Sequence, residues 1–282
     1  MDRIGVIGGG LMGSGITEVC ARSGLDTVTV EISQEAVQAA EAKVRGSLER
    51  AVSRGKLSEE DLAGVLDRIT FTTDLGRLSD RDLVVEAASE REDVKLDLFR
   101  TVGALLEKDD AILASNTSSI PIVKLGAVSG RAANVMGVHF FNPAPVMQLV
   151  ELIPSLTTSP ETLERMQTFV GKTLGKQPIE ATDRAGFVVN SLLVPYLLSA
   201  VRMYEAGYAS AADIDNGMVL GCGHPMGPLA LSDLIGLDTV RAIGISMYEE
   251  FKEPLYSPPP LLDRMVDAGL LGKKSGQGFY AY

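Results

Sequence analysis

The chain has few cysteines and no long apolar run. Its two cysteines, Cys20 and Cys222, are far apart and lack metal-ligand spacing, so we predict no metal site and expect both thiols to be structural. This usage is typical of a reducing compartment. No apolar run reaches the roughly 18 residues of a membrane span, and residues 1–10 lack the charged and apolar regions of a signal peptide. We therefore expect a cytoplasmic protein that does not insert into a membrane.

Positive charge is also scarce. Lysine and arginine total 26, against 37 aspartates and glutamates, and the formal net charge is −11. A general nucleic-acid binder needs a positive surface for phosphates, so the charge argues against that class of protein. Any anionic substrate must find a local basic patch. The length of 282 residues suggests two domains, the second smaller than the first.

Glycine is plentiful, and one group of glycines follows the first apolar run, residues 4–7. Gly8 permits a tight turn, Gly10 lets the backbone approach phosphates, and Gly13 allows the following helix to pack closely on the strand. A dinucleotide pyrophosphate would then lie at a helix N-terminus, which favours negative charge. A glycine-rich turn that binds nothing is the alternative. The predicted pyrophosphate site comprises Gly8, Gly10, Leu11, Met12 and Gly13.

An acidic residue at the right distance supports the dinucleotide interpretation. A second apolar run, residues 28–30, ends at Glu31, about 20 residues after the first glycine, where a ribose-binding acid is expected. A carboxylate there accepts a hydrogen bond from the 2′-OH of NAD and repels the 2′-phosphate of NADP. We therefore predict NAD as the cofactor.

Strand and helix signals alternate along the first part of the chain, which predicts a parallel sheet with helices on both faces. After about Asp183 the strand signals vanish, and helical segments such as 187–205 and 229–248 follow. We predict an α/β, Rossmann-type domain over residues 1–183 and an all-helical domain over 184–282. The expected strands are 4–7, 28–30, 83–85, 111–114, 135–140 and 147–152, and the expected helices between them are 12–23, 34–54, 58–66 and 94–106.

The strongest catalytic signal is His139 at the end of an apolar strand, followed by Glu151. Prolines at 143 and 145 force a turn between them. If the flanking strands run antiparallel, His139 and Glu151 become cross-strand neighbours. The carboxylate would fix the tautomer of the imidazole and favour its charged form, so that the histidine accepts a hydroxyl proton. A core histidine satisfied by a turn carboxylate explains the spacing equally well, and His224 is expected to be structural.

Six segments in order resemble the L-3-hydroxyacyl-CoA dehydrogenase family in its short, single-function form. The resemblance covers almost the whole chain and implies an NAD-dependent oxidoreductase that interconverts (S)-3-hydroxyacyl-CoA and 3-ketoacyl-CoA. Short substrates such as 3-hydroxybutyryl-CoA and acetoacetyl-CoA are expected, in fatty-acid or butanoate metabolism. Besides the glycine loop, the matching segments are 115–119 (SNTSS), 139–143 (HFFNP), 183–190 (DRAGFVVN), 225–228 (PMGP) and 272–280 (GKKSGQGFY).

The resemblance also implies roles for individual residues. His139 is the catalytic base with Glu151 as its partner, while Ser118 and Asn190 contact the substrate near the reacting carbon. The helical domain is expected to form a homodimer, and its apolar segment 192–198 either lines that interface or belongs to the core. The family positions near NAD, beyond the glycine loop and Glu31, are Glu90, Lys95, Ser118, Asn142 and Lys274.

Coenzyme A brings phosphates and therefore needs a basic surface. Ser47, Arg50 and Arg54 fall on one face of a predicted helix, with Lys56 just beyond. Ser47 and Arg54 match CoA contacts of the family, as does Ser118, although relatives commonly have lysine in place of Arg54. A solvated charged face is the alternative. Glu31 likewise replaces the aspartate common in the family, but it keeps the negative charge.

Two other functions remain open at this point. A sugar-acid dehydrogenase of the same superfamily would share the fold and the histidine–glutamate pair. An inactive nucleotide-binding or structural relative would not need the complete set of Ser118, His139, Glu151 and Asn190. The motifs do not specify the acyl chain length or the physiological direction.

Overall fold

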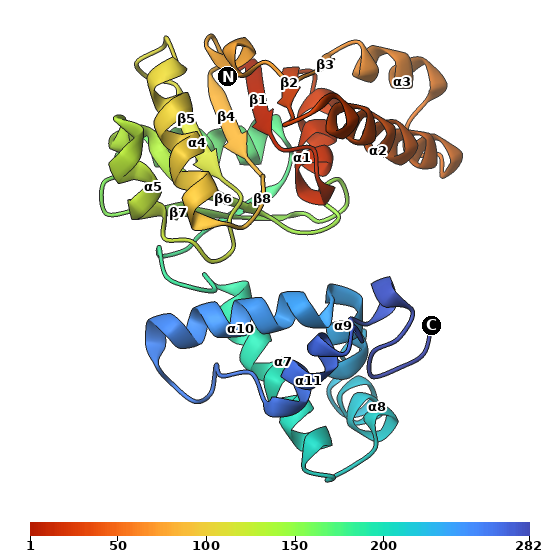
Figure 1. The fold of residues 1–282 in the computed structure, drawn as a ribbon. Coiled ribbons are helices and arrows are strands. Elements are labelled where there is room, and N and C mark those ends of the chain that lie inside the picture. The colour runs from red at the N-terminus through yellow and green to blue at the C-terminus, as the bar shows by residue number, and fades with distance from the viewer. The chain divides into compact units, whose positions relative to one another are not determined.

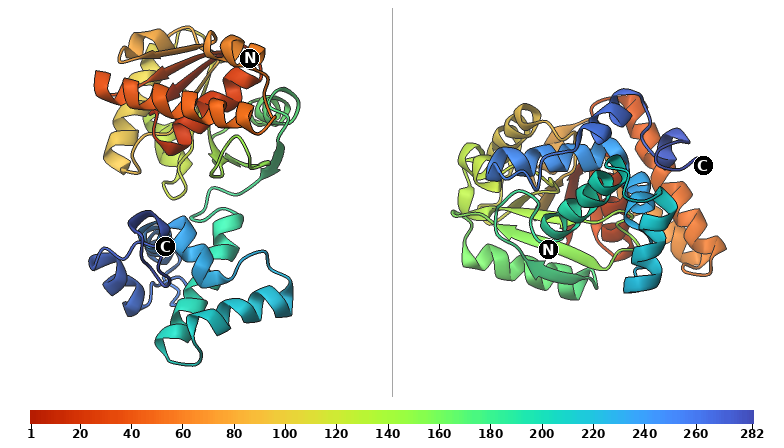
Figure 2. Two further views of the ribbon diagram at one scale, coloured as in Figure 1. Left: turned by 90° about the vertical axis from the view of Figure 1, so that its right-hand side faces the viewer. Right: turned by 90° about the horizontal axis from the view of Figure 1, so that it is seen from below.

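The computed structural model describes residues 1–282 and separates into two units, Met1–Asp183 and Arg184–Tyr282 (Figures 1 and 2). The first unit has alternating strands and helices, and the second is helical. The predicted fold class, a Rossmann-type α/β domain followed by an all-helical domain, is therefore confirmed. None of the helices combines the length and the apolar character needed to cross a membrane.

The first unit is built on one eight-stranded sheet with the order β3-β2-β1-β4-β5-β6-β7-β8. All neighbouring strands are parallel except β6 and β7, which are antiparallel. The strand order reverses between β1 and β4, and open α/β sheets bind ligands at the carboxyl ends of the strands beside such a switch. The strands are β1 (Arg3–Ile7), β2 (Asp26–Val30), β3 (Ile69–Thr72), β4 (Leu83–Glu86), β5 (Ile112–Ser115), β6 (Val135–Phe140), β7 (Leu149–Pro154) and β8 (Gln177–Glu180).

Six helices accompany this sheet. Apolar residues of the central strands and of α1 form its main core, and α2 and α3 cover a smaller cluster around Val44 and Leu48. Ser58 caps α3, because its hydroxyl accepts the N–H of Asp61 at 3.0 Å. The helices are α1 (Leu11–Arg22), α2 (Gln34–Ser53), α3 (Glu59–Leu66), α4 (Glu92–Leu105), α5 (Ile122–Ser129) and α6 (Pro160–Thr168).

The second unit has its own apolar core, to which α7 contributes Val194, Leu197 and Leu198. The prediction of one helix over 229–248 is wrong. Gly236 has φ +103° and separates α9 from α10, because a positive φ is a backbone conformation that ends a helix and favours glycine. The helices are α7 (Val189–Glu205), α8 (Ala211–Cys222), α9 (Pro228–Ile235), α10 (Leu237–Phe251) and α11 (Pro260–Asp267).

Two buried aspartates hold the last residues of the chain against α9. Asp233 accepts the N–H groups of Phe279 and Tyr280 at 3.0 and 2.9 Å. Asp215 accepts the Tyr280 hydroxyl at 2.8 Å and also the N–H of Leu229, in the first turn of α9, at 2.8 Å. The C-terminal segment is therefore fastened by two carboxylates that hydrogen-bond to neutral donors.

The two cysteines differ in exposure. Cys20 is buried in the core of the first unit, and burial raises the pKa of its thiol to about 12, as expected for a packing residue. Cys222 ends α8 and is exposed, so its thiol does not pack in a core.

Candidate active site

The glycine loop joins β1 to α1 at the carboxyl edge of the sheet. Gly8 has φ +90°, and a Cβ on Gly13 would lie 1.7 Å from the Gly8 carbonyl oxygen, so both positions require glycine. A Cβ on Gly10 would meet nothing within 4 Å, and no side chain caps α1. The loop thus leaves an open approach to uncapped N–H groups at a helix N-terminus, which fits a pyrophosphate.

Glu31 lies directly beside this loop. It follows β2, and its Oε1 accepts the N–H of Gly9 at 2.5 Å while its Oε2 accepts the N–H of Ile32 at 3.0 Å. The carboxylate is therefore held at the end of β2 next to the phosphate-binding turn. A ribose-binding acid is expected at this place.

His139 and Glu151 form a close pair on β6 and β7. They are cross-strand partners in the antiparallel ladder, which confirms the predicted register. The His139 Nδ1 lies 2.7 Å from Glu151 Oε2, and the Glu151 side chain is fully buried. Because the carboxylate acts at Nδ1, it orients the ring and makes Nε2 the nitrogen suited to proton transfer. The chain can therefore hold a histidine–carboxylate pair for general acid–base chemistry.

The backbone beside His139 is also fixed. The N–H of Phe140 donates to Asn116 Oδ1 at 2.8 Å, and the Phe141 ring packs edge-on against the imidazole with its centroid 4.7 Å away. Asn116 follows β5, so the amide links the ends of two neighbouring strands. Asn142, predicted near NAD, is exposed in the turn directly after β6.

A buried carboxylate that the sequence analysis missed ends β4. Glu86 is fully buried and accepts from Lys95 Nζ at 2.6 and 2.8 Å and from the Ser115 hydroxyl at 2.6 Å. Lys95 is itself 1 % exposed, so its ammonium faces Glu86 within the protein. The available signal was an acidic residue closing the otherwise apolar run 83–85.

Glu90 connects Lys95 to the loop that carries Ser118. Its Oε2 lies 3.3 Å from Lys95 Nζ, and its Oε1 accepts the Ser118 N–H at 3.0 Å and the Ser119 hydroxyl at 2.9 Å. Burial raises the pKa of Glu90, but the charge of Lys95 and the hydrogen bonds from residues 117–119 outweigh it and lower that pKa. Glu90 is therefore a carboxylate anchor for the Ser118 loop.

The remaining predicted site residues of the second unit lie on two segments. Asn190 is buried in the first turn of α7, 8 % exposed. Lys274 lies in the short helical turn Lys273–Ser275, where its Nζ is 2.5 Å from Asp238 Oδ1. Their predicted contacts with substrate and NAD stay predictions.

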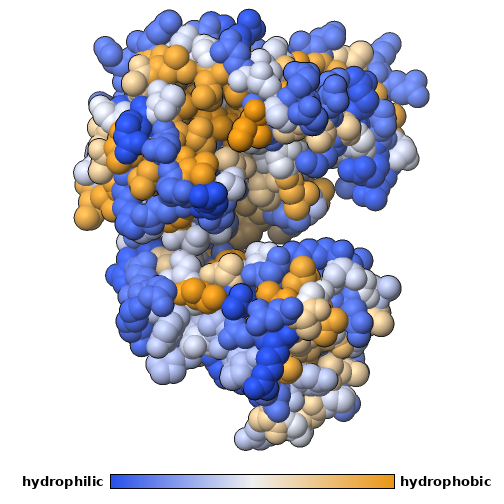
Figure 3. Space-filling model, viewed as in Figure 1, coloured by the Kyte–Doolittle hydropathy of each residue, from blue (hydrophilic) through white to orange (hydrophobic).

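The predicted CoA contacts lie toward the end of α2. Ser47 is half-buried, Arg54 caps the C-terminus of the helix, and Lys56 follows after Gly55. Arg50, Arg54 and Lys56 are exposed, and none of them forms an ion pair. Figure 3 shows hydrophilic residues covering α2 and α3 in that view. This surface offers cationic groups that are not neutralised within the protein.

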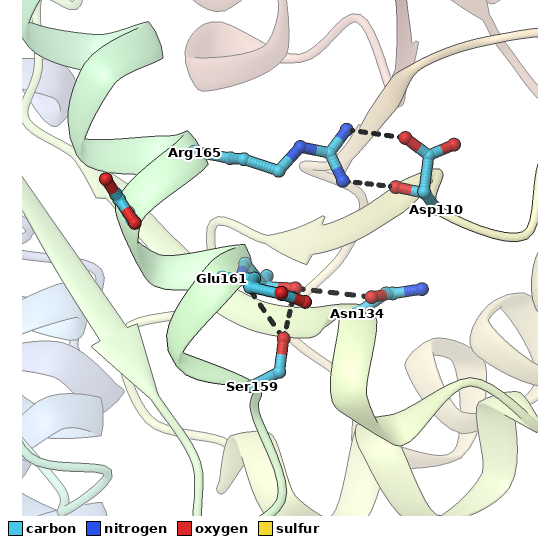
Figure 4. A pocket seen from close by; sticks show the side chains of 7 residues that line it. Asp110, Asn134, Ser159, Glu161 and Arg165 are labelled. Atoms are coloured by element: carbon cyan, nitrogen blue, oxygen red, sulfur yellow. Dashed lines mark hydrogen bonds and ion pairs between the residues drawn. The ribbon is translucent and has the colours of Figure 1, made fainter.

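A pocket elsewhere in the first unit does not belong to this site (Figure 4). Arg165 binds Asp110 across it, with Nη2 3.2 Å from Oδ2, and the Thr162 hydroxyl donates to Asn134 Oδ1 at 3.2 Å. Asp110 and Asn134 precede β5 and β6, so the pocket lies at the amino ends of strands whose carboxyl ends carry Ser115 and His139. It contains none of the predicted site residues.

Known proteins resemble this chain along its whole length. Two family models match, "3-hydroxyacyl-CoA dehydrogenase, NAD binding domain" over residues 3–184 and "3-hydroxyacyl-CoA dehydrogenase, C-terminal domain" over 186–282. A 3-hydroxybutyryl-CoA dehydrogenase from Mycobacterium tuberculosis is 54% identical over 282 residues, covering 100% of this chain and 99% of the relative.

Two solved structures have the same fold. The crystal structure of FadB2 from M. tuberculosis has a TM-score of 0.99 at 54% identity, and covers 100% of this chain and 99% of that one. The structure of (S)-3-hydroxybutyryl-CoA dehydrogenase PaaH1 from Ralstonia eutropha has a TM-score of 0.95 at 46% identity, with the same coverage.

Proposed function

The chain belongs to the 3-hydroxyacyl-CoA dehydrogenase family, and from that premise we propose that it interconverts (S)-3-hydroxybutyryl-CoA and acetoacetyl-CoA. It is an NAD-dependent oxidoreductase. The names of its relatives support the short-chain substrate. The observation that carries the chemistry is the 2.7 Å pair of His139 and Glu151 at the carboxyl end of β6.

The residues present fit NAD. The glycine loop offers an open approach at Gly10 and the uncapped first turn of α1, and Glu31 beside this loop is proposed to accept hydrogen bonds from the ribose hydroxyls. Bound at this loop, NAD would supply the acceptor for the hydride that leaves C3 of the substrate. The protein supplies orientation and charge around that exchange.

His139 moves the proton. In the oxidation direction its Nε2 accepts the proton of the 3-hydroxyl, and the fully buried Glu151 carboxylate at Nδ1 stabilises the imidazolium that results. In the reduction direction the imidazolium returns this proton to the substrate oxygen. The Ser118 hydroxyl and the Asn190 amide are proposed to donate to substrate oxygens, so that charge developing there is met by oriented dipoles.

CoA binding is assigned to the exposed cations at the end of α2. Arg54 and Lys56 form no ion pair within the chain, so their charges are available to phosphates. Ser47 is proposed to add a hydroxyl on the same helix.

We also propose that the protein works as a homodimer through its second unit. Most of segment 192–198 is core, but Leu192 remains 74% exposed, and Leu220 on α8 and Leu234 on α9 are 82% and 51% exposed. Large apolar side chains left in water favour an interface. Light scattering at micromolar concentration tests the proposal, and a monomer would refute it.

A substrate series tests the proposed activity. We expect NADH oxidation to be fastest with acetoacetyl-CoA and to fall as the 3-ketoacyl chain lengthens. Free sugar acids with NAD serve as the comparison, because a sugar-acid dehydrogenase would prefer them. A higher kcat/KM on long acyl chains would correct the substrate, and activity on sugar acids alone would refute the function.

A further inference from the structure

The peptide of Gly9 in the cofactor loop is flanked by opposite charges. Its N–H donates to Glu31 Oε1 at 2.5 Å, and its carbonyl oxygen accepts from Lys43 Nζ at 3.5 Å. The Ser14 hydroxyl donates to the same carbonyl at 2.7 Å. A carboxylate and an ammonium group therefore lie on either side of one peptide in the loop.

Close packing of α2 on the loop brings Lys43 to this place. A Cβ on Gly9 would lie 2.3 Å from the Ala40 Cβ, so the helix and the loop are in direct contact. Lys43 lies three residues after Ala40 and so shares its face of α2. The position of the ammonium group follows from the helix and from the absence of a side chain at residue 9.

The charge of Lys43 is not neutralised. Its side chain is exposed and forms no ion pair, whereas Arg45 on the same helix lies 3.5 Å from Glu41. The Lys43 ammonium can therefore bind an anion without first breaking an ion pair. Its neighbour Glu31 is the group that would oppose such an anion.

We propose that Lys43 is a latent ligand for the 2′-phosphate of NADP, and that Glu31 keeps it from acting. The proposal rests on the proposed function, which places the ribose 2′-OH at Glu31. A phosphate on that oxygen faces the Glu31 carboxylate, and the repulsion excludes NADP. Once that carboxylate is removed, the ammonium of Lys43 becomes a charge-assisted partner for the phosphate. The preference between NAD and NADP thus depends on two side chains beside Gly9, because Glu31 repels the 2′-phosphate and Lys43 attracts it.

Lys43 also precedes Ser47, Arg50 and Arg54 on one stripe of α2, at positions i, i+4, i+7 and i+11. This spacing makes a CoA contact the competing assignment. The hydrogen bond to the Gly9 carbonyl favours the cofactor, because it holds the ammonium at the phosphate-binding loop.

The experiment measures binding without catalysis, by calorimetry of 2′,5′-ADP and of 5′-ADP, which lacks the 2′-phosphate. The variants are E31S, K43A and E31S/K43A, with R45A as the matched removal of a cation from the same helix. We expect E31S to bind 2′,5′-ADP about tenfold more tightly than the wild type, and E31S/K43A to lose most of that gain. The effect of K43A on 5′-ADP is expected to be several-fold smaller, and R45A is expected to resemble the wild type.

Equal affinity of E31S and E31S/K43A for 2′,5′-ADP would overturn the role of Lys43. A higher KM for acetoacetyl-CoA in K43A, with no effect on either nucleotide in the E31S background, would also overturn it and assign Lys43 to CoA. These results differ from a failure of the proposed function, in which the wild-type protein would not reduce acetoacetyl-CoA with NADH. Circular dichroism of each variant verifies the fold.

Discussion

The two units bury negative charge in different ways. In the first unit, the buried carboxylates Glu86 and Glu151 each meet a side chain that can carry a positive charge, Lys95 at 2.6 Å and His139 at 2.7 Å. In the second unit, the buried Asp215 and Asp233 form no ion pair and accept only from N–H and hydroxyl donors. The same chemical group therefore has two kinds of environment.

The difference separates carboxylates that have a cationic partner beside the proposed site from carboxylates that hold the backbone in place. Glu86 ends β4, and His139 lies at the carboxyl end of β6 opposite Glu151 on the antiparallel strand β7, so both pairs lie at the edge of the sheet where open α/β sheets bind ligands. Asp233 instead fastens the C-terminal segment, and a Cβ on Gly278 would lie 2.0 Å from its Oδ1. The glycine motif near the C-terminus thus has a structural reason in the close approach of backbone to carboxylate.

The two buried aspartates of the second unit change the pKa values of the tyrosines that donate to them. Burial, the charge of Asp233 and the hydrogen bond to it raise the pKa of Tyr282 to about 12. Burial and Asp215 likewise raise the pKa of Tyr280. Both hydroxyls therefore stay protonated and keep donating over the physiological range.

Among tests of this difference between the carboxylates of the two units, we expect the largest effect at His139, the partner of Glu151. Replacing it in H139Q should lower kcat by about 10² to 10⁴, the range for loss of a general base. The affinity for NADH, measured by fluorescence titration, should hardly change because the glycine loop is distant in sequence and untouched. E151Q keeps the size and a hydrogen bond to Nδ1 but not the charge, so we expect a smaller loss of kcat. Near wild-type turnover in H139Q would contradict the proposed mechanism.

The next effect concerns the buried pair of Glu86 and Lys95. K95M leaves Glu86 buried without its cation, and we expect the first unit to lose about 3–5 kcal/mol of unfolding free energy. Urea unfolding measures it. K124M is the control, because Lys124 pairs with Glu92 at 2.8 Å on the surface, where a pair contributes at most about 1 kcal/mol.

Adding E86L to K95M is expected to restore part of the stability, since no charge then remains buried at β4. Equal stability of K95M and K124M would show that Glu86 does not depend on its cation. The proposed difference between carboxylates stabilised by a cation in the first unit and by neutral donors in the second would then be contradicted.

A smaller effect is expected in the second unit. D233N places an amide NH₂ against donors, because both carboxylate oxygens of Asp233 accept hydrogen bonds. We expect a loss of about 1–3 kcal/mol, measured by thermal unfolding, and no dependence on salt because no cation is involved. D213N, at an exposed aspartate of α8, is the control. A strong salt dependence of the D233N effect would contradict the comparison.

Local patterns predicted the parts of the fold and site that depend on short segments. The glycine loop, β6 and the cross-strand pair of His139 and Glu151 follow from residues close in sequence. Strands β3 and β8 were missed because they lie at the edges of the sheet, are only partly buried, and need not be apolar. The proline in β8 also argues against a strand except at an edge.

Partners distant in sequence could not be predicted from the same patterns. Glu86 and Ser115 are 29 residues apart, and Asp215 and Tyr280 are 65 residues apart. A charged residue that is buried looks the same in sequence as one that is exposed. Their roles follow from the tertiary structure, which supplies the donors and the desolvation.

The smallest effect is expected at Asp82, just before β4. Its carboxylate is contacted both by a cation, as in the first unit, and by backbone N–H groups, as in the second unit. Its Oδ2 accepts the N–H groups of Asp2 and Arg3 at 2.8 and 3.1 Å, and its Oδ1 lies 2.5 Å from Lys108 Nζ. Burial raises the pKa of Asp82, but the hydrogen bonds from Lys108 and from these N–H groups outweigh it and lower the pKa to about 2.

Because the pKa in the folded protein is depressed below the unfolded value of about 4, Asp82 stabilises the protein above that pH and loses this contribution as the pH falls toward 2. We expect D82N to cost about 1 kcal/mol at pH 7, measured by urea unfolding, and the difference from wild type to shrink between about pH 4 and pH 2. High salt should screen only the contribution of Lys108 to the free energy of unfolding. The loss caused by D82N should therefore depend on salt less than a loss due to an ion pair alone, and more than the loss caused by D233N. D2N is the control, because Asp2 has an almost fully exposed side chain. A difference that stays constant from pH 7 to pH 2 would show that the charge of Asp82 is not what stabilises this end of the sheet.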